Sequence, residues 1–143
     1  MKTIALLALF LLVPTLLGSV SAEREFAQVG LFNISFEMNR THDIKEIEDG
    51  IYIRTLDGNI VVDLGRDKSG TTNLDEFIKL TGAKHPSVET LQIDGKDARL
   101  ATTIGGGYIA LYYPLQGWIA IVASDLSMKE IPDFFKTLHI EPI

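Results

Sequence analysis

The segment IYIRTLDGNIVVDL, residues 51–64, places two apolar runs on either side of Asp57-Gly58. An Asp-Gly pair between two such runs is a strong short-range signal for a β-hairpin, because the tight turn needs positive φ angles at its centre. The segment therefore predicts two antiparallel strands, Ile51–Leu56 and Asn59–Leu64, joined by a short turn.

An Asp-Gly pair also lies between two apolar runs further along the chain, at Asp94-Gly95. It predicts another hairpin, with strands Val88–Ile93 and Ala98–Ile104. Two more strands are predicted after it, Tyr108–Tyr113 and Trp118–Ser124. The second of these is apolar on both of its faces, which is typical of a strand with a layer of structure on either side.

The residues before the first hairpin divide into an alternating part and a polar part. Leu31–Met38 alternates apolar and polar side chains with a period of two, which predicts a half-buried strand. Residues 39–49 are mostly polar and lack this alternation, so they are predicted to form a loop. Three strands are thus expected before the first helix.

Two helices complete the prediction. Apolar residues repeat at helical spacing over residues 73–81, with Thr72 as the expected N-cap. The second helix is expected to begin at Pro132 after an irregular turn over Ser127–Ile131, because proline inside a helix removes a backbone donor. The order β-β-β-α-β-β-β-β-α predicts an α+β fold, a mainly antiparallel sheet of about six to seven strands packed with two helices.

Four of these features together resemble the PsbP-like fold. They are the strand Phe32–Phe36, the helix after a β-hairpin, the hairpin at Ile93–Lys96, and the closing segment Ile131–Leu138 after an apolar strand. The fold is shared by photosystem II extrinsic proteins, a Ran-binding import factor and exported prokaryotic domains, and the resemblance covers residues 29–140. It implies an antiparallel sheet between helices and a non-enzymatic role in binding or complex assembly, and it assigns no functional residue.

Residues 1–22 have the pattern of a secretory signal peptide. Lys2 precedes an apolar run, Ile4–Leu17, and small residues lead to Ala22, after which cleavage is predicted. The alternative is a membrane anchor over residues 4–20, but a spanning helix needs about 20 apolar residues. The sequence therefore predicts an exported α+β domain over residues 23–143, secreted, periplasmic or on the cell surface.

Charge and composition exclude several classes of function. The formal net charge is −6, and it becomes −7 when Lys2 is removed with the signal. An acidic domain without a cluster of Lys and Arg is not expected to bind nucleic acid or an anionic membrane surface. A membrane contact is expected only through an uncleaved signal segment. The chain has no cysteine, which excludes disulfides, thiol catalysis and cysteine-based metal sites.

No catalytic, cofactor or metal motif stands out, and no catalytic residue is predicted. The three histidines, His42, His85 and His139, lie in separate segments without the spacing of a helical metal site. Surface positions are the simplest interpretation. The alternative is a small exported hydrolase whose site is assembled from residues distant in sequence, such as His42 with Asp43 or Glu46.

The aromatic residues near one predicted turn are the best candidates for a binding patch. Tyr108, Tyr112, Tyr113 and Trp118 gather there. Tyr and Trp are enriched at recognition surfaces, but they are equally common as strand residues packed under a helix. The leading hypothesis is an exported, non-enzymatic binding or complex-assembly module whose partner is a protein or another envelope component.

Two sequons are possible glycosylation sites in an exported chain. They are Asn33-Ile34-Ser35 and Asn39-Arg40-Thr41. Asn39 is the better candidate because it lies in a predicted loop. Asn33 lies in a predicted strand and is expected to be poorly accessible.

Overall fold

The computed structural model describes residues 23–67, 73–80, 87–102, 105–126 and 132–143. Three features named above lie outside the described residues. They are the predicted signal peptide with its cleavage position after Ala22, the histidine at position 85 (His85), and the predicted turn Ser127–Ile131. The described elements are, in order, β1 (Glu23–Val29), β2 (Phe32–Met38), β3 (His42–Ile47), β4 (Gly50–Thr55), β5 (Asn59–Arg66), α1 (Leu74–Leu80), β6 (Ser87–Ile93), β7 (Lys96–Thr102), β8 (Tyr108–Leu115), β9 (Trp118–Ser124), α2 (Pro132–Thr137) and β10 (His139–Pro142).

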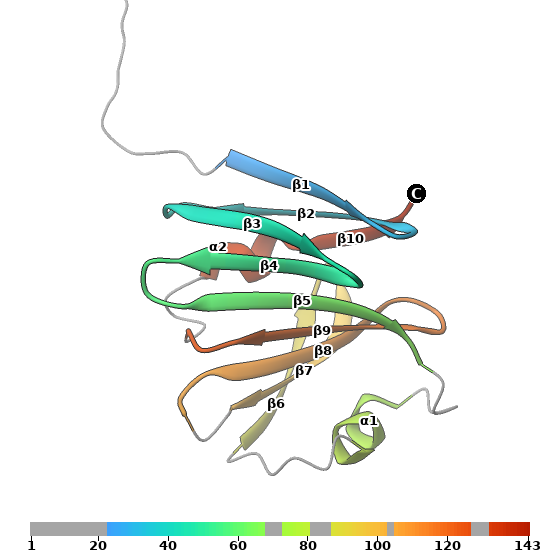
Figure 1. Cartoon of the computed structure of the whole chain (residues 1–143). Coiled ribbons are helices and arrows are strands. Elements are labelled where there is room, and N and C mark those ends of the chain that lie inside the picture. Colours follow the sequence, from blue (N-terminus) through green and yellow to red (C-terminus); the bar gives the residue numbers. More distant parts are fainter. Residues whose placement is uncertain (1–22, 68–72, 81–86, 103–104, 127–131) are drawn as a thin grey trace, which may run out of the picture.

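The strands form two antiparallel sheets (Figure 1). The large sheet has seven strands in the order β3-β4-β5-β9-β8-β7-β6, and the small sheet has three in the order β1-β2-β10. In the view of Figure 1 the small sheet lies at the top, next to β3, while α1 and β6 lie at the bottom. The large sheet therefore has one face toward the small sheet and α2, and an outer face on which α1 packs.

The α+β class, the antiparallel pairing and the two short helices are confirmed, but the predicted strand number and order are wrong. The structure adds β1, β3 and β10, which gives ten strands divided between two sheets. Residues 39–49 do not form a loop throughout, because His42–Ile47 pairs with Gly50–Thr55. This strand is mostly exposed on both of its faces, so it has no apolar alternation to reveal it.

Both hairpins are confirmed, although their turns differ. Asp94 and Gly95 have φ angles of 56° and 72°, as a two-residue hairpin turn requires. Asp57-Gly58 has no positive φ angle. There the Thr55 hydroxyl oxygen accepts hydrogen bonds from the N–H groups of Asp57 and Gly58, at 3.3 and 3.1 Å. Glycine is required at position 58 for another reason: a Cβ atom would collide with the carboxylate of Asp125.

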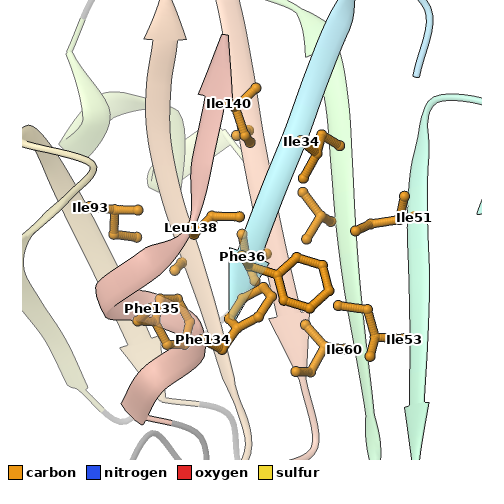
Figure 2. Packing of buried hydrophobic residues seen from close by; sticks show 14 of the residues in the cluster. Ile34, Phe36, Ile51, Ile53, Ile60, Ile93, Phe134, Phe135, Leu138 and Ile140 are labelled. Atoms are coloured by element: carbon orange, nitrogen blue, oxygen red, sulfur yellow. The ribbon is translucent and has the colours of Figure 1, made fainter. Parts of the chain in front are cut away.

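The main core lies between the two sheets (Figure 2). Ile34 and Phe36 of β2 point toward the inner face of the large sheet, and Phe134 of α2 packs against Phe36 with ring centroids 5.1 Å apart. These side chains are almost completely buried. Burying a side chain of this size contributes about 1.5–3 kcal/mol, so the contact between the sheets is the main source of stability.

A second, smaller cluster attaches α1 to the outer face of the large sheet. Leu74 of α1 packs with Leu111 of β8 and Ile119 of β9. Neighbouring residues of β9 point into the main core instead, which confirms the prediction of a strand covered on both faces. Asn73 caps the helix, because its Oδ1 accepts hydrogen bonds from the N–H groups of the first turn. Thr72, the predicted cap, lies outside the described residues.

Candidate binding site

A polar cavity of about 400 Å³ opens where α1 meets the outer face of the large sheet. Its walls come from the start of α1, from β7 and from β8. The apolar cluster under Leu74 fixes the helix at this position, so the polar residues around it are held over the strands. The lining residues are Asn73, Leu74, Asp75, Lys96, Asp97, Arg99 and Tyr113.

Arg99 is the central charge of this cavity. Its Nε atom donates to Asp75 Oδ1 and its Nη1 atom to Asp97 Oδ1, both at 2.8 Å. Asp97 and Arg99 lie two residues apart on β7 and therefore share a face of the strand. The hydrogen bond from Arg99 lowers the pKa of Asp75, so this carboxylate is ionised. The ion pair also links α1 to β7, across 24 residues of sequence.

Tyr113 contributes a phenol to the same cavity. Its hydroxyl donates a hydrogen bond to Asp67 Oδ2 at 2.9 Å, just after the end of β5. Burial and the nearby Asp67 carboxylate raise the pKa of Tyr113 to about 12. The phenol therefore stays neutral and acts as a donor at physiological pH.

The cavity presents hydrogen-bond acceptors that remain accessible to solvent. The side chains of Asp75 and Asp97 are 59% and 63% exposed although both bind Arg99. Lys96 directs its Nζ atom to Asp94, 3.5 Å from its Oδ2 atom. Oxygen atoms of the two carboxylates are thus accessible to solvent. The described lining residues supply hydrogen-bond donors and acceptors, which suits the cavity to polar recognition.

The four predicted aromatic residues do not gather on one surface. Tyr108 and Tyr112 are 3% and 0% exposed and belong to the main core. Tyr113 is the next residue on β8 and points to the opposite face, because successive strand residues alternate. Trp118 packs on Phe32 with ring centroids 4.9 Å apart. Of the four, Tyr113 is the one that lines the cavity.

The structure separates His42 from Asp43. The two are consecutive on β3 and point to opposite faces, and Asp43 pairs with Arg54 at 3.4 Å. The Nε2 atom of His42 lies 2.9 Å from Glu25 Oε2, and its Nδ1 atom lies 2.7 Å from the carbonyl oxygen of Arg40. Both ring nitrogens thus face an acceptor, Glu25 Oε2 on one side and the carbonyl oxygen of Arg40 on the other.

His139 is held in a similar way at the opposite side of the small sheet. Its Nδ1 atom lies 2.8 Å from Asp94 Oδ2, and its Nε2 atom lies 3.2 Å from Glu141 Oε2. The hydrogen bonds that His139 donates to Asp94 and then to Glu141 raise the pKa of His139. This histidine connects the two sheets, because β10 belongs to the small one and Asp94 lies in the β6–β7 turn of the large one.

Both sequon asparagines are exposed. Asn39 lies just after β2, as expected from its predicted loop. Asn33 is in strand β2 but lies on the outer face of the small sheet, whose other face covers the core. The expectation that its strand position makes Asn33 poorly accessible is therefore wrong.

The residues Asp75, Asp97 and Arg99 were not predicted from the sequence. Asp97 and Arg99 could have been noticed as opposite charges on one face of a predicted strand. Asp75 could not have been joined to them, because only the packing of α1 brings it there. Within the described ranges, no helix is long and apolar enough to cross a bilayer, and no three acidic or histidine side chains are grouped to bind a metal ion.

Comparison of the chain with known protein families, with curated proteins and with solved structures found no match. The resemblance to the PsbP-like fold therefore stays a prediction, as do export and the identity of any partner.

Proposed function

We propose that this protein is an exported, non-enzymatic binding or complex-assembly module, and that the cavity beside α1 is its binding surface. Export follows from the signal pattern of residues 1–22. An assembly role agrees with the resemblance to the PsbP-like fold. The partner is a protein or another component of the cell envelope.

The accessible carboxylates of Asp75 and Asp97 carry this proposal. Arg99 holds both side chains in place, yet more than half of each remains exposed. Fixed acceptors cost little conformational entropy when a partner binds them. They favour a partner that presents N–H donors, such as a lysine, an arginine or an amide group.

The hydrolase alternative has one observation in its favour, which is the contact of His42 with the carboxylate of Glu25 at 2.9 Å. A hydrolase also needs a ring nitrogen that can take a proton from a nucleophile or water. The second nitrogen of His42 faces the carbonyl oxygen of Arg40. The binding module is therefore the preferred proposal.

The first experiment is native mass spectrometry of the protein purified from the envelope of its own host. A second component that stays bound supports the proposal and gives its mass. The variant Asp97→Asn should lose this component, because it weakens an acceptor of the cavity. Asp43→Asn is the matched control, since Asp43 is also an exposed strand residue paired with an arginine. Finding the chain only by itself, or equal binding in both variants, contradicts the proposal.

A further inference from the structure

The sequon Asn39-Arg40-Thr41 forms the short connection between β2 and β3. Asn39 and Thr41 are both exposed, and none of the three residues belongs to a strand. In an exported protein, a sequon that receives a glycan is expected in a surface connection of this kind. The structure therefore places Asn39 where a bulky, hydrophilic modification can be added.

The backbone of this connection is held on both sides while the Asn39 side chain is exposed. The N–H group of Asn39 donates to Asp133 Oδ2 at 2.7 Å, near the start of α2. The carbonyl oxygen of Arg40 lies 2.7 Å from Nδ1 of His42, and the Arg40 guanidinium pairs with Asp57 at 3.5 Å. These contacts use the backbone of Asn39 and the groups of its neighbours. A sugar on the Asn39 side chain therefore breaks none of them.

A pocket beside Asn39 gives the first sugar a place to lie. Its volume is about 330 Å³, at the lower end of the range for small-molecule sites. The lining residues are Asn39, Arg40, Thr41, Leu56 and Asp57. Leu56 lies just after β4 and is 92% exposed. The carbon-bound hydrogens of a sugar ring would cover this apolar side chain, and its hydroxyl groups would remain beside the charged groups of Arg40 and Asp57.

The other sequon has a different environment. Asn33 is exposed, but it lies in the middle strand of the small sheet, directly opposite Gln28 of β1 and Glu141 of β10. The third residue of this sequon, Ser35, is only 6% exposed. A transferase that acts on the folded domain reaches the hydroxyl of Thr41 but not that of Ser35.

We propose that Asn39 carries an N-linked glycan and that Asn33 does not. The donor is a lipid-linked sugar phosphate of the host. The Asn39 Nδ2 atom forms a bond to the anomeric carbon of the first sugar, and the bond from that carbon to the phosphate oxygen breaks. The amide loses one proton and the phosphate leaves as an anion, so the transfer needs no oxidant or reductant. The proposal rests on export, which is part of the proposed function, because sequons are glycosylated in exported chains.

The glycan and the cavity beside α1 lie at different ends of the molecule. In Figure 1 the connection between β2 and β3 lies at the left, near the β4–β5 turn, whereas α1 lies at the lower right. A glycan at Asn39 therefore leaves the cavity accessible to a partner. It covers instead the end of the sandwich at which Leu56 is exposed.

The test uses the protein purified from the envelope of its own host and digested with a protease that cleaves after glutamate. Glu37 lies between the two asparagines, so the digestion places Asn33 and Asn39 in separate peptides. Mass spectrometry should find carbohydrate on the peptide that contains Asn39 and none on the peptide that contains Asn33. The intact mass of the same sample shows whether residues 1–22 have been removed.

Two variants expressed in the same host, Asn39→Gln and Thr41→Val, should each lose the carbohydrate completely. Thr41→Ser is the matched control, because serine keeps the hydroxyl of the sequon and should retain the carbohydrate. A bare Asn39 on a chain without residues 1–22 overturns the proposal and leaves export intact. Carbohydrate on Asn33, or equal loss in both Thr41 variants, overturns it as well. A bare chain that still begins at Met1 overturns export together with the glycan, so the two failures are distinguishable.

Discussion

The contact of His139 with Asp94 should make the stability of the protein depend on pH. His139 lies on β10 of the small sheet, and Asp94 lies in the β6–β7 turn of the large sheet. The imidazole is placed between Asp94 and Glu141, and Lys96 lies 3.5 Å from the same Asp94 carboxylate. Breaking this contact removes a polar link between the two sheets.

The direction of the effect follows from the pKa of His139, which Asp94 and then Glu141 raise above the ordinary value of 6.5. A pKa that is higher in the folded than in the unfolded protein means that the folded state binds the proton more tightly. The stabilisation is therefore fully present below pH 6.5 and is lost as the pH rises through the folded pKa. Because the His139 side chain is 41% exposed, solvent screening reduces its contribution to about 0.5–1 kcal/mol.

Thermal unfolding followed by circular dichroism at acidic and at mildly alkaline pH measures this contribution. Wild type should melt about 2–6 °C above His139→Gln at the acidic pH, and the difference should disappear at the alkaline pH. Asp94→Asn should reduce the same difference while keeping the turn, because asparagine tolerates the φ angle of 56° at this position. A difference that grows with rising pH, or that is the same at both pH values, would refute the reasoning.

Two further predictions concern the packing of single residues. Tyr112→Phe should raise the free energy of unfolding by about 1 kcal/mol in urea denaturation, because the Tyr112 hydroxyl is buried without a hydrogen-bond partner; a loss of stability would contradict this. Gly58→Ala should lower it by about 2 kcal/mol or more, because the new Cβ collides with the Asp125 carboxylate. Gly65→Ala is its control, since a Cβ there meets no atom within 4 Å, and equal losses in both would contradict the argument.

The parts of the fold that could be predicted are those in which local sequence and packing agree. The two predicted Asp-Gly hairpins have apolar runs on either side of their turns. Strand β9, which is covered on both faces, is apolar along most of its length. Strand β3 could not be found in this way, because its side chains are mostly exposed on both faces. The pairing of its backbone with β4 forms it, and the alternation of side chains gives no information on that pairing.

The position of the cavity depends on tertiary packing and not on local sequence alone. Asp97 and Arg99 on an exposed strand face resemble an ordinary solvated surface, and Asp75 resembles an ordinary acidic residue in the first turn of a helix. What joins them is the apolar contact of Leu74 with Leu111 and Ile119, which is set by tertiary packing. Because Asp75 follows Leu74 directly, docking of the helix through Leu74 brings the Asp75 carboxylate to the Arg99 guanidinium. The polar site is thus a consequence of where an apolar side chain is buried, and its position becomes predictable once the docking of α1 is known.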